Sequence, residues 1–431
     1  MHPERTVRSQ TTALTMTPPS AVRPSLSALA PGWTAAASAL ALVMAGAASV
    51  QAGAMRRVPE DFASIPAAVV ASAPGDTILV GPGKWTGFVA LTDKSGEGLV
   101  LRAAAGPEKT TIVYGDSADV NLAVITFQRC SDATRLIGFS IDGRSVARYG
   151  VLVGSDSKPR LEDVSIAGCE FGVASVRGAA PTLRGVTTRE SHTAGLFVSA
   201  GTADVQDSRF LKGDKFGVYV GATSAPVQLR NVEASENAQA GVQVIDGELA
   251  FDGGTVAKNG DVGILVQGSS PRISRVTVSD QKGVGVVLER SSATLDGCTV
   301  RGNEFGAVAS LEGEPHVVRC TFADNRTYHF GVEGAAGPVV GGSLAEANRF
   351  LGSPALRLQT SSSSRVNATF DFWDAACPSD SLFKRLGTGE LAHAPWASAD
   401  LLRSFGDCDS ARAYAPGPPQ AGAGDSTSAK R

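Results

Sequence analysis

A short apolar segment follows a glycine about every 22 residues along the middle of the chain. The segments read, for example, GVLV, GVAS, GLFV and GVYV, and the steps between their glycines are 22, 23, 22, 24, 22, 22 and 21 residues. A fixed period of this length indicates a repeat architecture, in which each unit buries its apolar face only against its neighbours. The glycines are Gly150, Gly172, Gly195, Gly217, Gly241, Gly263, Gly285 and Gly306.

A second register of apolar residues has the same period. Further small or apolar residues follow each of its members after three and after five positions. We interpret these positions as columns of inward-facing side chains. The register consists of Leu161, Leu183, Val205, Leu229, Phe251, Ile273, Leu295 and Val317.

A repeat of 22 residues has room for three short strands and three corners, and no helical period of 3.6 is present. The chain is therefore predicted to be an all-β, right-handed parallel β-helix whose coils stack about 4.8 Å apart. A proline opens the second strand of several coils, where its fixed φ fits a corner. These are Pro159, Pro181, Pro226, Pro271 and Pro315.

One corner of the repeat carries a column of amides, namely Asn237, Asn259, Gln281, Asn303 and Asn325. Asn tolerates positive φ, and stacked amides can hydrogen-bond from coil to coil, which predicts a structural asparagine ladder. The position before it alternates in charge on neighbouring coils, as in Glu190, Lys212, Glu236, Lys258 and Asp280. Opposite charges stacked in this way stabilise modestly.

The ends of the chain differ from the repeat. An apolar run at 33–50 predicts that residues 1–54 are a secretory signal with a preceding extension, and the alternative is a retained membrane anchor. Ser64 precedes a short apolar helix at 65–73 that would cover the first coil, and residues 76–80 would begin the first strand. We predict the β-helix over 55–365, a C-terminal cap over 366–410 and a disordered tail over 411–431, which is rich in Pro, Gly, Ala and Ser.

Six cysteines bear on the compartment and on the cap. Cys377 and Cys408 flank the non-repetitive C-terminal segment, and we expect a disulfide between them if the chain is exported. Cys298 and Cys320 share one inward column, so they are either a disulfide or buried thiols. Cys130 and Cys169 have no evident partner.

The overall charge limits the classes of partner. The formal net charge is −3, with 39 Lys and Arg against 42 Asp and Glu, so no basic field exists to hold a nucleic acid. No His and Cys spacing typical of a zinc site occurs, and nothing in the sequence requires a cofactor.

Both ends resemble a known family. The segments RVPEDFASIPAAVVASAPGDTILVGPGKWTG and LVLRAAAGPEKTTIVYG at 57–87 and 99–115 are similar to the opening of pectin-lyase-like and NosD-like β-helix proteins with PbH1 repeats. The segments 366–380 and 393–396 resemble the terminal cap of such proteins, although Phe372-Trp373-Asp374 replaces Trp-Trp-Gly. The resemblance covers roughly 56–400 and implies the fold.

The resemblance also implies where an active site would lie. Enzymes of this family use carboxylates, Arg or Lys on one external face to act on acidic polysaccharides, in some lyases with calcium. The chain has no Asp-Asp pair of the polygalacturonase type, and Gln206-Asp207 lacks the Arg-x-Trp that accompanies it in pectin methylesterases. No cluster of several Asp residues suited to calcium is present.

One external column remains a candidate catalytic site. Glu170, His192 and Asp214 occupy the same register on three consecutive coils, so His192 could lie between two carboxylates that polarise it as a base. Residues expected near it to bind an acidic sugar are Arg189, Lys212, Lys215 and Tyr219. The alternative is a solvated charge stack, because the same column holds Ala, Gly, Lys and Arg on other coils.

The interpretation favoured by these patterns is an exported protein, secreted, periplasmic or at the cell surface, that binds an extended glycan or a cell-surface protein. Such a protein would meet a membrane only through an uncleaved signal segment. One alternative is a polysaccharide lyase or glycoside hydrolase that uses the His192 column. Another is a NosD-like periplasmic accessory protein, which the lack of Met-rich or His-rich clusters disfavours.

Overall fold

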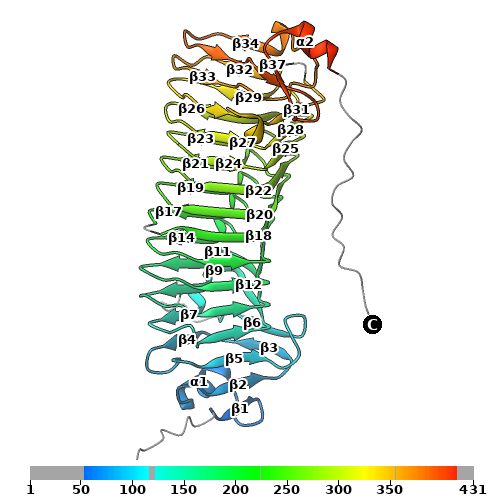
Figure 1. Ribbon diagram of the computed structural model, residues 1–431. Helices are drawn as coiled ribbons and strands as arrows, with labels where there is room; N and C mark the ends of the chain where they lie inside the picture. The colour runs from blue at the N-terminus through cyan, green and yellow to red at the C-terminus, as the bar shows by residue number, and fades with distance from the viewer. Residues whose placement is uncertain (1–52, 116–121, 224, 355, 415–431) are drawn as a thin grey trace, which may run out of the picture. The chain divides into compact units, whose positions relative to one another are not determined.

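A computed structural model describes residues 53–115, 122–223, 225–354 and 356–414, all of which belong to one compact unit. In these residues 35 strands join into one sheet that winds as a right-handed parallel β-helix (Figure 1). The predicted fold class is confirmed. The predicted signal segment, apart from its last two residues, lies outside the described residues.

Each coil contributes one strand to each of three faces. Face A contains β1 (Met55–Val58), β2 (Thr77–Val80), β5 (Val100–Ala103), β8 (Arg135–Ile137), β10 (Arg160–Glu162), β12 (Thr182–Arg184), β15 (Asp204–Gln206), β24 (Thr294–Asp296), β27 (His316–Val318), β30 (Val339–Val340), β33 (Val366–Asn367), β35 (Leu391–Ala392) and the first halves of β18 (Val227–Ser235), β20 (Leu249–Ala257) and β22 (Arg272–Ser279). Face B contains the second halves of these three strands, the starts of β9 (Ser140–Gly154) and β11 (Ser165–Val176), and β3 (Gly83–Thr86), β6 (Thr110–Val113), β13 (Thr187–Arg189), β16 (Arg209–Leu211), β25 (Thr299–Arg301), β28 (Thr321–Ala323) and β31 (Arg349–Leu351). Face C contains the ends of β9 and β11, and β4 (Val89–Thr92), β7 (Ala123–Gln128), β14 (Ala194–Ser199), β17 (Phe216–Gly221), β19 (Ala240–Ile245), β21 (Val262–Gln267), β23 (Val284–Glu289), β26 (Phe305–Ser310), β29 (Tyr328–Val332), β32 (Leu358–Thr360) and β34 (Phe383–Arg385).

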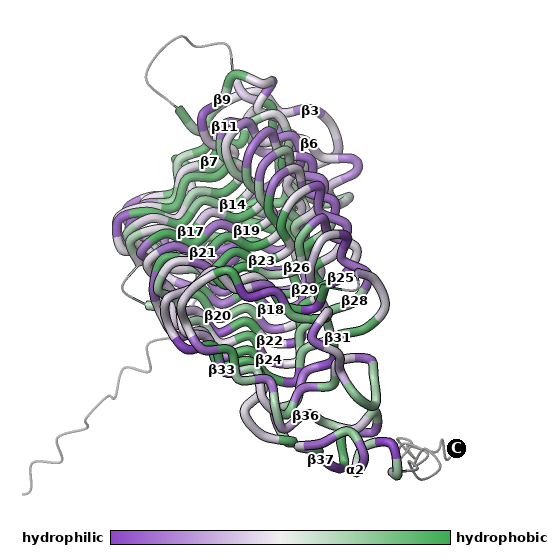
Figure 2. Tube along the Cα trace, turned by 90° about the horizontal axis from the view of Figure 1, so that it is seen from above, coloured by the Kyte–Doolittle hydropathy of each residue, from purple (hydrophilic) through white to green (hydrophobic). Residues whose placement is uncertain are grey.

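The predicted columns are vertical neighbours inside the coils. Leu183 pairs in register with Val205, and Val205 pairs with Leu229, and none of the three is exposed to solvent. One hydrophobic core therefore runs through the stack. Burying a Val or Leu side chain stabilises by roughly 1.5–3 kcal/mol, and a coil gains this only when the next coil covers it. Figure 2 shows hydrophilic residues on the turns beside β6 and β25.

The repeated glycine and the repeated asparagine belong to one structural device at the corner between faces B and C. Asn237 donates its backbone N–H and its side-chain Nδ2 to Asn259 Oδ1, both at 3.0 Å. The backbone N–H bonds continue through Gln281, Asn303 and Asn325, although the Gln281 side chain donates to the Val256 and Ser279 carbonyls instead of to Asn303. A Cβ on Gly217 would lie 2.7 Å from Asn237 Nδ2, so the inward amides leave no room for a side chain there.

Asparagine was expected in this column partly because it tolerates positive φ, and that part of the prediction was wrong. Positive φ occurs at the preceding charged residues, with 55° at Lys212, 60° at Glu236 and 56° at Lys258. The asparagines themselves do not have positive φ. They are favoured because the buried amide satisfies the backbone groups that the tight corner leaves without a ladder partner.

The N-terminal end is covered as expected, with one addition. Helix α1 (Ile65–Ala71) begins at Ser64, whose Oγ accepts a hydrogen bond from the Ala67 N–H at 3.3 Å. Its Ile65 and Val69 pack onto the core. The first strand is β1 rather than the segment at 76–80, because β1 pairs with β2 and adds one more rung.

The C-terminal end departs from the predicted boundaries. Parallel pairing continues to β35, so the coils reach beyond residue 365. The remaining elements are two 3-10 helices, η1 (Leu344–Glu346) and η2 (Asp380–Leu382), a small antiparallel pair, β36 (Trp396–Ala397) and β37 (Ser404–Phe405), and helix α2 (Cys408–Ala413). The expected start of the tail at 411 therefore falls inside α2.

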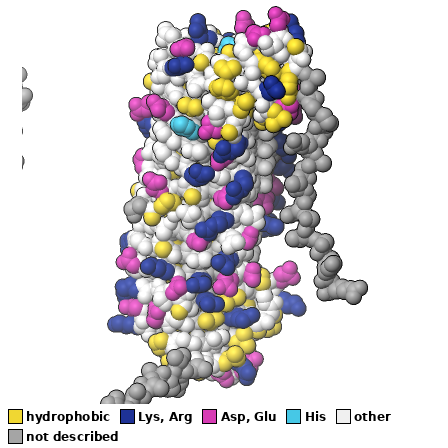
Figure 3. Space-filling view, in the orientation of Figure 1, with side chains coloured by type: hydrophobic (Ala, Val, Ile, Leu, Met, Phe, Trp, Pro, Cys, Tyr) yellow, Lys and Arg dark blue, Asp and Glu magenta, His cyan; other side chains and the backbone are white. Residues whose placement is uncertain are grey.

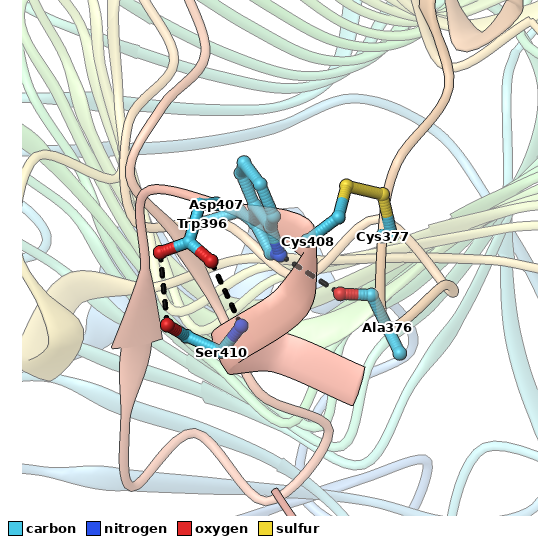
Figure 4. Close-up of a disulfide and its surroundings, with 6 residues drawn as sticks. All are labelled: Ala376, Cys377, Trp396, Asp407, Cys408 and Ser410. Carbon is cyan, nitrogen blue, oxygen red and sulfur yellow. Dashed lines mark hydrogen bonds between the residues drawn. A yellow bond between two sulfur atoms is a disulfide. The ribbon is translucent and has the colours of Figure 1, made fainter. Parts of the chain in front are cut away.

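A disulfide joins this last helix to the end of the coils. Cys377 is bonded to Cys408, with 5.1 Å between their Cα atoms (Figure 4). Beside it, Trp396 donates its Nε1–H to the Ala376 carbonyl at 3.0 Å, and Asp407 caps α2 by accepting from the Ser410 N–H at 2.8 Å. Trp373 is fully buried and stacks on Phe350 with 4.5 Å between ring centroids, closing the core below this segment.

Candidate functional site

The outer side of face A is charged, and many of its charges are paired between coils. Arg230 Nη1 lies 2.5 Å from Asp204 Oδ1, and Asp296 lies between Arg272 and Arg319 at 3.2 and 2.6 Å. Figure 3 shows Lys and Arg side chains spread down the front of the molecule with Asp and Glu beside them. Exposed ion pairs of this kind contribute about 0–1 kcal/mol each to the free energy of unfolding. Their main effect is to keep the outer side of face A polar.

A polar trough, which we call the A–B trough, follows the corner between faces A and B over several coils. It consists of three adjoining hollows, of which two share Asp163 and Gly185 and two share Asp207. Its lining residues are Pro107, Glu108, Ser140, Arg160, Glu162, Asp163, Val164, Ser165, Thr182, Arg184, Gly185, Thr187, Arg189, Asp207, Ser208, Arg209, Asn231, Val232, Glu233, Gly254 and Thr255.

The trough is hollow because the corner is tight. Asp163, Gly185 and Asp207 have φ of 51°, 63° and 50°, so a single residue turns the chain from face A to face B. Gly185 has no side chain to fill the corner, and a Cβ there would lie 2.6 Å from Asp163 Oδ1. Val164 and Val232 are buried and close the floor. The local sequence therefore leaves a groove with polar walls.

Some of the charged groups in the A–B trough are neutralised by neighbours. Arg160 Nη2 lies 2.7 Å from Asp132 Oδ2, and this guanidinium lowers the pKa of the Asp132 carboxyl below its usual value. Arg209 lies 3.5 Å from Glu233. The side chains of Arg184, Glu162 and Asp163, in contrast, have no hydrogen-bond or ion-pair partner in the part of the chain that the structure describes.

The predicted column of Glu170, His192 and Asp214 lies elsewhere, on the outside of the corner between faces B and C. His192 Nδ1 is 2.8 Å from Asp214 Oδ2. Glu170 instead pairs with Arg148 at 3.4 Å. The side chains of His192 and Asp214 are 44% and 67% exposed. The structure thus forms half of the expected arrangement, in an open position.

The four predicted ligand-binding residues do not converge on His192. Lys212 pairs with Glu236 at 3.8 Å, and Tyr219 joins a stack of rings on face C. Arg189 lines the A–B trough. Lys215 makes no side-chain hydrogen bond or ion pair within the described ranges, although its carbonyl accepts from the backbone N–H groups of Gln239 and Ala240.

Sequence reasoning missed a row of aromatic rings on the outside of face C, which we call the aromatic ridge. Its rings belong to Tyr149, Phe171, Phe197 and Tyr219 on four consecutive coils, with centroid separations of 5.4, 4.7 and 5.2 Å. They pack on Ala174 and form a small cluster outside the core. Phe197 and Tyr219 stand two positions after a repeated glycine, and Tyr149 and Phe171 stand directly before one, so the signal is divided between two registers of the repeat.

The described residues offer no evident metal centre or membrane span. Among them, no group of three or more His, Cys, Asp or Glu side chains could hold a metal ion. In the same residues, no helix is long and apolar enough to cross a bilayer.

Comparison with solved structures finds parallel β-helix proteins. The A-module of the mannuronan C-5 epimerase AlgE6 from Azotobacter vinelandii is 16% identical, covers 76% of this chain and 93% of its own, and has a TM-score of 0.48. The periplasmic alginate epimerase AlgG is 11% identical over 74% of this chain and 77% of its own, with a TM-score of 0.36. The catalytic domain of a GH87 alpha-1,3-glucanase is 11% identical over 80% and 69%, with a TM-score of 0.41.

These likenesses concern the fold. No curated protein matches the chain. The family described as "Right handed beta helix region" matches residues 113–273 and 262–369, which together make up more than half of the sequence. On that coverage, and with coils that pair in parallel register throughout, the chain belongs to the right-handed β-helix family.

Proposed function

We propose that this protein binds an extended glycan in the A–B trough and acts outside the cytoplasm. The observation that carries the proposal is the continuity of the trough, whose three hollows join through Asp163, Gly185 and Asp207. Polar side chains repeat along it with the spacing of the coils, about 4.8 Å. A regular array of this kind suits a linear repeating ligand better than a compact one.

The chemistry of the trough suits sugar hydroxyls. Arg184 offers a planar fork of donors, and Glu162 and Asp163 offer carboxylate acceptors, all without partners among the described residues. Hydrogen bonds to ionised groups are roughly twice as strong as neutral ones, so such groups fix the orientation of a hydroxyl-rich ligand.

The location is proposed from the disulfide. A bond between Cys377 and Cys408 persists in an oxidising environment and is rare in the cytosol. An exported protein with this fold would meet polysaccharides at the cell surface or in the surrounding medium.

A second candidate function is catalysis at the B–C corner, and one contact favours it. Asp214 holds His192 Nδ1 at 2.8 Å, which orients the imidazole with Nε2 directed away from the carboxylate. An oriented imidazole can act as a general base in a lyase or a hydrolase.

A panel of acidic and neutral polysaccharides, with and without calcium, tests both candidates. Retention on immobilised glycans should identify a ligand, and Arg184→Ala should weaken that binding about tenfold or more, as expected for the loss of a charged hydrogen bond. Arg301→Ala is the matched control, because Arg301 is exposed on the outside of face B and is not among the lining residues. Equal losses in both variants would refute the trough as the site, and new reducing ends or unsaturated products would show an enzyme.

A further inference from the structure

Two buried thiols lie one above the other in the upper coils. Cys298 and Cys320 are 2% and 1% exposed. Leu295 pairs in register with Val317 three residues before them, and Val300 pairs with Phe322 two residues after them. The backbone N–H of Cys298 donates to Cys320 Sγ at 3.3 Å, so the two side chains are direct neighbours.

The geometry of adjacent coils permits a bond between these sulfurs. Neighbouring strands lie about 4.8 Å apart, and disulfides span Cα separations of about 4.4–6.8 Å. Cys298 directly follows the corner at Gly297, where φ is 63°, and lies just before β25. The pair therefore occupies a turn, where local adjustment disturbs less of the sheet than it would in mid-strand.

Other members of the inward column that contains Cys298 and Cys320 show why a sulfur is tolerated in the buried interior. Elsewhere in it, an oxygen accepts the backbone N–H of the coil below: Ser208 Oγ accepts from Val186 at 3.1 Å, and Asn348 Oδ1 accepts from Cys320 at 2.7 Å. Cys320 Sγ takes the same role as a weaker acceptor, whereas Val232 and Val276 in this column offer no acceptor at all. Cys298 Sγ and Cys320 Sγ donate to the carbonyls of Ile273 and Leu295, both at 3.5 Å, so the two thiols have matching partners on adjacent coils.

We propose that Cys298 and Cys320 form a redox modification site that closes to a coil-to-coil disulfide by exchange with a disulfide oxidant. The Cys298 thiolate attacks one sulfur of the oxidant and expels a thiolate, and the Cys320 thiolate then attacks the Cys298 sulfur and expels the second. Two electrons pass to the oxidant, and the two protons of the cysteines pass to its leaving thiolates. The hydrogen bond from Cys320 lowers the pKa of Cys298.

This site is independent of glycan binding and would fasten the upper coils near the cap. The cap already contains the bond between Cys377 and Cys408, which forms in the same kind of compartment. Because both thiols are buried, exchange requires the coils to open locally, and mild heating or a low concentration of urea should speed it.

The test uses the full chain, oxidised glutathione as the oxidant, and alkylation after denaturation. We expect two of the four free thiols to be lost, and trypsin to release residues 291–301 and 320–326 as one linked species that separates on reduction. The oxidised protein should also melt at a higher temperature than the reduced one. Cys298→Val and Cys320→Val are the matched variants, since Val fills this column at Val186 and Val276, and neither should show the melting shift.

Two results would overturn the proposal. One is full alkylation of both cysteine-containing peptides after treatment with the oxidant. This result counts only under conditions in which the alkylating agent also reacts with the folded protein, because the buried thiols are then accessible. The other is glutathione attached separately to each cysteine with no linked species. Cys130 and Cys169 serve as internal references, because each is buried and should remain unlinked.

Discussion

The two corners that flank face B differ in whether their polar side chains are hydrogen-bonded within the protein. At the B–C corner the amides of Asn237, Asn259 and Asn303 face inward and bond to the next coil. At the A–B corner, the side chains of Asp163 and Arg184 face a hollow, and neither has a partner among the described residues. Both corners repeat with the coil, but the amide ladder uses its hydrogen-bonding groups, whereas the side chains of Asp163 and Arg184 leave theirs unused among the described residues.

This difference separates scaffold from candidate site. Buried polar groups are expensive unless they are satisfied, so a fully bonded amide ladder is a condition of the fold. Polar groups that remain unpaired in a groove have hydrogen-bonding capacity that a ligand can use. This difference leads to four predictions.

The first concerns the ladder. Asn259→Ala should destabilise the protein by about 2–4 kcal/mol, because it leaves the Asn237 N–H and the Ala234 carbonyl buried without partners. Urea unfolding measures the change. Asn231→Gly is the control, since Asn231 is exposed at the A–B corner with φ of 51°, which Gly adopts readily. If Asn259→Ala lowered the free energy of unfolding no more than the control does, the amide ladder would not be needed for the stability of the fold.

The second concerns the histidine above the ladder. Burial and the nearby Arg357 lower the pKa of His329 to about 3 from an ordinary value of 6.5. The unfolded chain therefore takes up this proton first, so stability falls as pH drops from 6.5 toward 3. Glutamine does not titrate in this range. The free energy of unfolding of His329→Gln should therefore fall by about 1–2 kcal/mol less than that of the wild type between pH 7 and pH 5. Parallel pH curves for the two proteins would contradict this.

The third fills the trough. Thr187→Trp places a large side chain among the lining residues and should reduce glycan affinity at least tenfold, about 1.4 kcal/mol, with little effect on the fold. Thr299→Trp is the matched control. Thr299 occupies the same outward register of face B as Thr187, which pairs with Arg209, and it lies four coils beyond Arg209. It is not among the lining residues. Unchanged binding by Thr187→Trp would exclude this part of the trough.

The smallest effect is expected at the exposed column. His192→Ala removes a surface contact with Asp214, so unfolding should change by no more than about 0.5 kcal/mol and glycan binding should be unaffected. Binding isotherms and urea curves check both. A large loss of activity would instead move the functional site to the B–C corner.

The sequence predicted the interior of this protein better than its surface. Inward columns such as Leu183 and Val205 must be apolar on every coil, so a single sequence repeats the constraint many times and shows the period. The amide ladder was visible for the same reason, although the residue with positive φ lies one position earlier.

Surface positions recur with the same period, but the type of residue that fills them is less constrained. The A–B trough arises from a single-residue corner and from side chains on two different strands, so no continuous motif marks it. The aromatic ridge depends on which strand positions face outward, and its rings come from two different positions of the repeat. The column of Glu170 and His192 had the right register, but the direction of each side chain depends on neighbours such as Arg148.

The most direct test of the account is a crystal structure of the chain with an oligosaccharide selected from the glycan panel. We predict sugar rings lying along the A–B trough, with hydroxyls bonded to Arg184 and to the carboxylate of Glu162 or Asp163. An oligosaccharide seated instead against the aromatic ridge or His192, with the trough filled only by water, would contradict the account.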